Sequence, residues 1–193
     1  MPRTKQFNES EVLDKALALF WRKGFNGTAI SDLVSHLGIN RASLYDTFGG
    51  KRELFMAALE RYQTSTEAHL IQTLEQDRPV LEIIEQILAS TIAATKEGEE
   101  CGCFMMNCTT ELASVDQEIA KIAAQNIDEK EELFFKLITK GQANGEISQK
   151  HHARALARYL FTTFSGLKAI AQSQASPEMM EDVKQVAMDS LRG

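Results

Sequence analysis

Side chains able to contact DNA gather in the segment INRASLYDTFGGK, residues 39–51. Arg41 carries a planar fork of N–H donors that matches O6 and N7 of guanine, although the same fork could bind a phosphate. Thr28 and Ser31 lie at a predicted helix start, where hydroxyls and free backbone N–H groups together suit a phosphate. The candidate DNA contacts are Thr28, Ser31, Asn40, Arg41, Ala42, Ser43, Tyr45, Thr47 and Lys51.

Three cysteines, Cys101, Cys103 and Cys108, lie close together in the segment EECGCFMMNC. Thiolates react with electrophiles and oxidants, and soft sulfur ligands select Cu(I), so a thiol sensor is one interpretation. Packing as small apolar side chains is the other. On one helix Cys103 and Cys108 would point about 140° apart, and the nearby glutamates would raise the pKa of a thiol. The sequence therefore favours packing, and Cys101, beside Gly102, is the best candidate for a sensing thiol.

The other reactive side chains do not indicate catalysis or a resident metal. The four histidines lie apart from the cysteines in sequence, so no zinc-ligand spacing is present. His151 and His152 are adjacent and would not face each other on a helix. A thiol enzyme is an alternative, but a C-x-x-C motif and a βαβ pattern are missing. We therefore expect no enzymatic activity, no cofactor and no metal site.

The DNA-contact candidates lie on a predicted helix–turn–helix at about residues 28–48. Thr28 is a suitable N-cap, and the apolar residues that follow it recur at helical spacing until Gly38 ends the helix. Asn40 or Arg41 then opens the next helix. A helix–turn–helix places its second helix in the DNA major groove, so this arrangement predicts a DNA reader.

Apolar periodicity predicts helices in the rest of the chain and indicates no strand. Gly24 ends a first helix, and proline at the first turn predicts helix starts at Pro79 and Pro177. The fold class is therefore all-α, with about nine helices. The expected helices after the helix–turn–helix cover about residues 51–74, 79–98, 103–114, 116–141, 150–172 and 177–191.

A set of apolar, glycine and polar positions runs through residues 8–60: Ala16, Leu19, Phe20, Gly24, Phe25, Thr28, Ile30, Asp32, Leu33, Gly38, Ile39, Leu44, Tyr45, Phe48, Lys51, Leu54 and Phe55. With these residues the segment resembles the DNA-binding domain of the TetR/AcrR family of bacterial transcription regulators. The resemblance implies a DNA-binding domain at residues 1–60 and an effector-binding and dimerisation domain at residues 61–193. It also implies that Tyr45 and Lys51 anchor phosphates and that the cysteines lie near the effector pocket.

The last two predicted helices are unusually apolar for a chain end. We expect them to form a homodimer interface, because a C2 dimer separates two recognition helices by one DNA turn, ~34–36 Å. Packing within one subunit is the alternative. The expected interface residues are Leu160, Phe164, Leu167, Val183 and Val186.

Charge is unevenly distributed along the 193 residues, whose net charge is −6. Residues 1–52 hold eight Lys and Arg against five Asp and Glu, whereas residues 53–193 hold thirteen against twenty-two. The basic end can contact phosphates, while the acidic remainder limits nonspecific binding. No apolar run approaches 18 residues and no apolar signal segment begins the chain, so we expect a cytoplasmic protein without a membrane partner.

Together these patterns predict a ligand-responsive transcription regulator, a repressor that leaves a palindromic double-stranded operator when a small-molecule effector binds. A DNA binder without an effector is the main alternative. Thiol-based redox or Cu(I) sensing is an alternative form of the signal.

Overall fold

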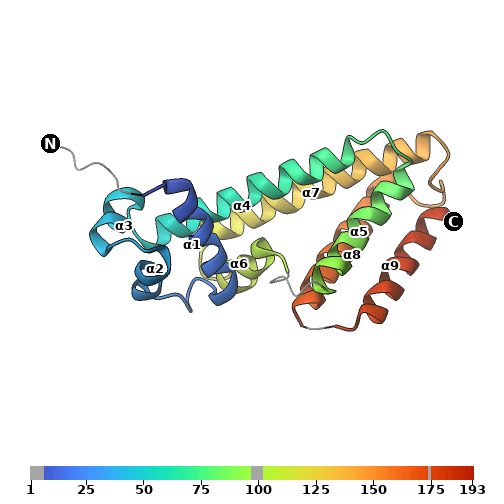
Figure 1. Cartoon of the computed structure of the whole chain (residues 1–193). Helices are drawn as coiled ribbons and strands as arrows, with labels where there is room; N and C mark the ends of the chain where they lie inside the picture. The colour runs from blue at the N-terminus through green and yellow to red at the C-terminus, as the bar shows by residue number, and fades with distance from the viewer. Residues whose placement is uncertain (1–6, 97–101, 174) are drawn as a thin grey trace.

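The computed structural model describes residues 7–96, 102–173 and 175–193. All regular structure in these residues is helical, which confirms the all-α prediction (Figure 1). The nine helices are α1 (Glu9–Lys23), α2 (Ile30–Leu37), α3 (Arg41–Phe48), α4 (Lys51–Leu74), α5 (Val80–Lys96), α6 (Phe104–Leu112), α7 (Gln117–Ala143), α8 (Ala153–Gln172) and α9 (Pro177–Arg192).

A cluster of aromatic rings lies within the N-terminal core. Phe20, Phe55 and Phe104 are almost completely buried. The ring centroids of Phe20 and Phe55 lie 5.2 Å apart and those of Phe55 and Phe104 5.8 Å apart, edge to face, as the ring quadrupoles favour. Trp21 and Tyr62 extend the cluster, with their centroids 5.1 Å apart. Since Phe104 belongs to α6, this later helix completes a core that α1, α2, α3 and α4 begin.

Aliphatic side chains dominate the C-terminal core, which α5, α7, α8 and α9 form. α7 packs along α8, and α5 lies against both α8 and α9. Fully buried members of this core include Val80, Ile83, Ile84, Leu88, Phe134, Ile138, Leu160, Met180 and Leu191. None of the described helices is both long and apolar enough to cross a bilayer.

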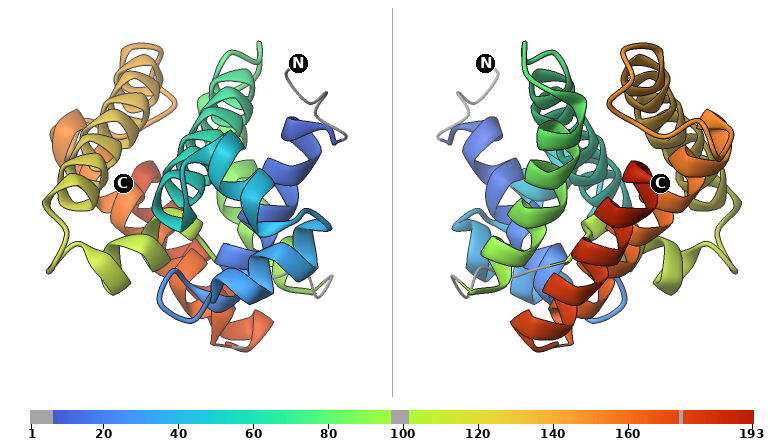
Figure 2. Two further views of the ribbon diagram at one scale, coloured as in Figure 1. Left: turned by 90° about the vertical axis from the view of Figure 1, so that its left-hand side faces the viewer. Right: turned by 90° about the vertical axis from the view of Figure 1, so that its right-hand side faces the viewer.

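The two long helices α4 and α7 join the two cores. They overlap in Figure 1, but the end-on views of Figure 2 separate them along most of their length. The N-terminal helices α1, α2 and α3 gather at one end, and α9 lies at the other. Residues of both helices line the cavity described below, together with residues of α5, α6 and α8.

Most predicted helix ends are confirmed within a residue or two, with one informative exception. Thr28 was expected to cap α2, but the N-cap is Ala29, whose backbone N–H donates to Asp32 Oδ2 at 3.2 Å. The Thr28 hydroxyl instead donates to the carbonyl oxygen of Gly24 at 2.6 Å and is buried. Thr28 thus fastens the end of α1 to the start of α2.

Candidate DNA-binding face and ligand cavity

Helix α3 presents an exposed face at one end of the molecule. Asn40 caps the helix, because its side-chain oxygen accepts a hydrogen bond from Ser43 N at 2.8 Å. Leu44 is fully buried and fixes the opposite face of α3 against the core. Arg41, Ala42 and Tyr45 are exposed, and the Arg41 guanidinium carbon lies 5.7 Å from the Tyr45 ring centroid. These three predicted DNA contacts are therefore accessible from outside the protein.

The other predicted DNA contacts on or near α3 differ in their accessibility. Ser31 is exposed in the first turn of α2, and Thr47 is partly exposed on α3. Lys51 begins α4 and places its ammonium 4.3 Å from the Phe25 ring centroid, a cation–π contact that steadies the side chain. Thr28 is wrongly included among the predicted contacts, because its buried hydroxyl is already bonded to Gly24.

A cavity of about 520 Å³ lies between α4, α5, α6, α7 and α8. This volume falls in the range of small-molecule binding sites. Its wall combines apolar side chains with hydroxyls, amides and two lysines. The lining residues are Tyr62, Ser65, Thr66, His69, Leu70, Thr73, Gln86, Ile87, Ser90, Cys103, Met105, Met106, Thr109, Thr110, Ala123, Asn126, Ile127, Lys130, Phe161, Phe164, Ser165 and Lys168.

The two described cysteines occupy different environments. Cys103 is the N-cap of α6, lines the cavity and accepts a hydrogen bond from the Tyr62 hydroxyl at 3.5 Å. Cys108 is only 1% exposed, and burial raises the pKa of its thiol to about 12. Burial is also the main reason that the pKa of Tyr62 rises well above its ordinary value. Cys101, expected to be the most accessible thiol, lies outside the described residues.

Helix α6 holds the loop between α1 and α2 through one carboxylate. Glu111 accepts hydrogen bonds from the backbone N–H of Phe25 at 2.9 Å and from that of Asn26 at 2.7 Å. The backbone reaches this carboxylate because Gly24 has a positive φ of 71°, and a Cβ atom there would lie only 2.7 Å from a Glu111 oxygen. The loop between α1 and α2 is therefore held by a helix that also lines the cavity.

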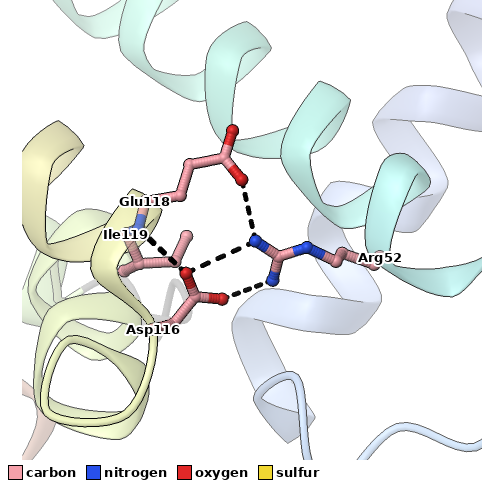
Figure 3. Close-up of polar contacts among 4 residues, drawn as sticks. All are labelled: Arg52, Asp116, Glu118 and Ile119. Atoms are coloured by element: carbon pink, nitrogen blue, oxygen red, sulfur yellow. Dashed lines mark hydrogen bonds and ion pairs between the residues drawn. The ribbon is translucent and has the colours of Figure 1, made fainter.

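A second link joins the start of α4 to the start of α7 (Figure 3). Arg52 donates to both oxygens of Asp116 and, at 2.8 Å, to Glu118. Asp116 also caps α7 by accepting from the backbone N–H groups of Glu118 and Ile119. The Arg52 contact lowers the pKa of Asp116, and its two carboxylate partners raise the pKa of Arg52. The two ends of α4 and α7 nearest the DNA-binding helices are thus tied together.

The predicted dimer residues divide between the inside and the outside of the chain. Leu160 and Leu167 are buried within one subunit, so the prediction that they are available to a partner is wrong. Phe164 lines the cavity and packs on Phe134, with ring centroids 6.0 Å apart. Val183 is partly buried on the C-terminal core, whereas Val186 is 63% exposed.

Other positions on α8 and α9 are also exposed or open to close approach. Met179 is 51% exposed and Tyr159 40% exposed. At Gly166 a Cβ atom would meet nothing within 4 Å, so the backbone of α8 is open to close approach there. We refer to Tyr159, Gly166, Met179 and Val186 as the outer α8–α9 face.

Sequence reasoning missed four functional candidates: Arg52, Glu111, Lys130 and Lys168. The lysines did carry a signal. Lys130 follows Ile127 by three positions, and Lys168 follows Phe164 by four, so each continues a stripe of side chains on one helix face. A lysine on an apolar stripe also occurs when its stem covers the core, and the pattern alone therefore did not identify them. The described residues contain no cluster of three or more His, Cys, Asp or Glu that could hold a metal ion.

Both the N-terminal and the C-terminal part of the chain match known families of bacterial regulators. The family described as "Bacterial regulatory proteins, tetR family" matches residues 12–58, and "Tetracyclin repressor-like, C-terminal domain" matches residues 80–187. YezE of Bacillus subtilis (strain 168), an uncharacterised HTH-type transcriptional regulator, is 33% identical over 99% of this chain and 100% of its own. The HTH-type transcriptional repressor ComR of Escherichia coli (strain K12) is 32% identical over 98% of this chain and 90% of its own.

Solved structures share the fold at lower sequence identity. A cysteine mutant of the TetR family transcriptional regulator CifR, in complex with a 26-bp double-strand operator DNA, superposes with a TM-score of 0.83 at 22% identity. The match covers 98% of this chain and 99% of the CifR chain. The reduced form of E. coli NemR superposes with a TM-score of 0.81 at 17% identity, over 94% of this chain and 96% of NemR.

Proposed function

This chain belongs to the TetR family of bacterial DNA-binding transcription regulators and is not an enzyme, and we propose that it works as a homodimeric repressor that a small-molecule effector releases from its operator. We assign operator binding to residues 1–60, and effector binding and dimerisation to residues 61–193, with α6 shared between the two. Its site of action is the cytoplasm, where bacterial DNA lies. The observation that carries the proposal is a cavity whose α6 wall also packs into the DNA-binding core.

In the proposed complex, α3 enters the major groove and its exposed residues read the operator. Arg41 contacts a guanine edge, and Asn40, Ala42, Ser43 and Thr47 lie on or beside the reading helix. Ser31, Tyr45 and Lys51 contact phosphates on either side of α3. Phosphate contacts fix the register and base contacts give the sequence preference, so the two sets of residues have different consequences when they are removed.

The effector acts by favouring one arrangement of the dimer over the other, because a ligand shifts an equilibrium only by its difference in affinity for the two states. A ligand in the cavity contacts α6 through Met105, Met106 or Thr109. Any displacement of α6 passes to the α1–α2 loop through Glu111. The distance between the two recognition helices then departs from one DNA turn, and affinity for the operator falls.

Operator binding is tested with two variants that should fail in different ways. The operator is first selected by sequencing the DNA fragments that the purified protein retains. Arg41→Ala should relax the preference at one base position per half-site, at about 1–3 kcal/mol, and Lys51→Ala should weaken all sequences alike and reduce the salt slope by about 1. Fluorescence anisotropy at several salt concentrations measures both effects, with Lys140→Ala, exposed on α7, as the control. Uniform weakening by Arg41→Ala would make Arg41 a phosphate contact.

Dimerisation through the outer α8–α9 face is tested by placing a charge in it. Val186→Glu puts two carboxylates into a C2 interface, one from each subunit, and burying an unpaired charge is unfavourable. We expect monomers in sedimentation velocity and loss of tight operator binding. Gln117→Glu adds the same charge at an exposed position of α7 and should leave the dimer intact. An unchanged dimer for Val186→Glu would place the interface elsewhere.

A further inference from the structure

On the α7–α8 wall of the cavity, several polar side chains make no hydrogen bond with any residue that the structure describes. On α4, the hydroxyls of Ser65, Thr66 and Thr73 donate to backbone carbonyls of their own helix. On α6, those of Thr109 and Thr110 do the same. By contrast, no hydrogen bond within the described residues engages the polar groups that α7 and α8 supply to the cavity, which are Asn126, Lys130, Ser165 and Lys168.

The charges of this wall are not balanced. The lining residues include two lysines and no aspartate or glutamate. Among the residues that the structure describes, neither lysine has a carboxylate within ion-pair distance, and Lys168 instead lies with its ammonium 4.8 Å from the Phe164 ring centroid. A site with two cations and no anion favours a negatively charged ligand.

Lys130 is the more constrained of the two cations. Burial lowers the pKa of its ammonium, and the field of Lys168 acts in the same direction. Glu67 and Glu129 oppose these effects from a distance but do not line the cavity. An anion bound between the two lysines would supply the opposite charge that the described residues lack. Because no ion pair has to be broken first, its attraction to the lysines would contribute fully to binding.

The remainder of the cavity is suited to an apolar group. Leu70, Ile87, Met105 and Phe161 line it. The side-chain hydroxyls of α4 and α6 already donate to their own backbone, so they are less available to a polar ligand group. Methionine adapts its shape to irregular apolar ligands. A ligand with its head group at α7 and α8 therefore extends its apolar part toward α6.

We propose that the effector is an amphipathic anion with one acidic head group, which Lys130 and Lys168 bind while α4, α5 and α6 enclose its apolar chain or ring. This assignment rests on the proposed effector function and names the class of ligand for the same cavity. The head group binds the α7–α8 wall, and the tail contacts the helix that holds the α1–α2 loop. A carboxylate and a sulfate ester share this head-group chemistry, and the experiment separates them.

The test compares ligands that differ only in the head group. Hexanoate, octanoate, decanoate and dodecanoate are titrated into the dimer by calorimetry beside the matching alcohols, amines and alkyl sulfates. We expect at least one chain length at which the carboxylate or the sulfate binds ten-fold or more tightly than the alcohol, with the amine weakest. The proposal is overturned if no anion in the series binds more tightly than its alcohol.

Variants of the lysines show where the preference arises. Lys130→Met and Lys168→Met should each reduce the preference for the anion several-fold, and the double variant should abolish it. Lys168→Arg keeps the charge and should keep the preference. Lys136→Met, at an exposed position of α7 outside the cavity, is the matched control, and thermal melts establish that each variant is folded. A double variant that is folded and still prefers the anion contradicts the proposal.

A separate measurement distinguishes this inference from the proposed function. Operator affinity is followed by anisotropy with the tightest anion present. Binding of the anion together with release of the operator supports both proposals. Anion binding that depends on the lysines but leaves operator affinity unchanged would confirm the ligand class and overturn its role as the effector.

Discussion

The two cores of this protein are filled in different ways. The N-terminal core contains a cluster of aromatic rings in contact with one another, in which Phe20, Phe55 and Phe104 are almost completely buried. The C-terminal core is mainly aliphatic, and a cavity of about 520 Å³ lies where it borders the N-terminal core. Close packing gives a region one well-defined arrangement, whereas a hollow region can accept a ligand or change its shape.

This difference matters because one short helix belongs to both regions. Phe104, Cys108 and Leu112 of α6 lie in the aromatic core, while Met106 and Thr110 face the cavity. In the proposed mechanism, the closely packed N-terminal core follows a displacement of α6 as a unit, and α3 changes position without changing its own structure. The comparison therefore explains how a ligand could alter DNA binding without touching the DNA-binding helices.

The largest expected effect comes from opening a void in the packed region. Phe55→Ala should lower the free energy of unfolding by about 3–5 kcal/mol, because a fully buried phenylalanine leaves a cavity that its neighbours fill poorly. Phe161→Ala, at the partly buried cavity wall, should cost only about 1–2 kcal/mol. Urea unfolding at one protein concentration measures both. Equal losses would mean that the two regions are packed equally well.

An intermediate effect is expected where the two regions meet. Glu111→Ala removes the acceptor of two backbone N–H groups at the α1–α2 loop, and hydrogen bonds to a charged group contribute about 1.5–3 kcal/mol in all. The same variant should make operator affinity less responsive to the ligand, because α6 no longer holds the loop. Glu60→Ala, at an exposed position of α4, is the control. A full ligand response in Glu111→Ala would show that the signal passes by another route.

The sequence predicted the positions of the helices well, but it predicted their packing and hydrogen-bond partners less well. Caps and periodicity located α3, α7 and α9, since Asn40, Asp116 and Pro177 favour helix starts in most contexts. The role of Thr28 was not predictable in the same way, because its hydroxyl could bond either forward to α2 or back to Gly24. In the folded chain the Thr28 hydroxyl donates its hydrogen bond to the carbonyl oxygen of Gly24.

Helix periodicity also left open which neighbour each apolar face would meet. The broad apolar face of α8 favoured a homodimer interface that includes Leu160, and packing of Leu160 within one subunit was the alternative. In the structure Leu160 belongs to the chain's own core, and Val186 on α9 remains outside. Similarly, no local spacing could bring Glu111 to Phe25 or Arg52 to Asp116, because these pairs are far apart in sequence and meet only after both cores have formed.

A smaller effect is expected from the second link between the regions, and it depends on pH. Because Arg52 lowers the pKa of Asp116, this carboxylate stabilises the fold above its ordinary pKa of 3.8, and the stabilisation is lost as the pH falls through the lower folded value. Arg52→Met should remove this part of the acid dependence. Urea midpoints between pH 2 and pH 6 test it, with Arg192→Met at the end of α9 as the control. An unchanged acid profile would mean that the link does not stabilise the folded state.

The smallest effect on stability is expected at the two described cysteines. Their rates of alkylation compare the accessibility of the two regions directly. Cys103 lies at the hollow region and Cys108 in the packed one. In a Cys101→Ser background, Cys103 should react with iodoacetamide at pH 8 and be protected by a ligand in the cavity.

Cys108 should stay unmodified until the protein unfolds, because its thiol is buried and its pKa is raised from 9.0 to about 12. A raised pKa of an acid stabilises the folded state below the ordinary value, and this contribution is lost as the pH rises from about 9 toward 12. Mass spectrometry of the alkylated peptides, with Cys103→Ser and Cys108→Ser as matched controls, measures the two rates. Similar rates for both thiols would show that the aromatic core opens as readily as the cavity, and the contrast between the two regions would then fail.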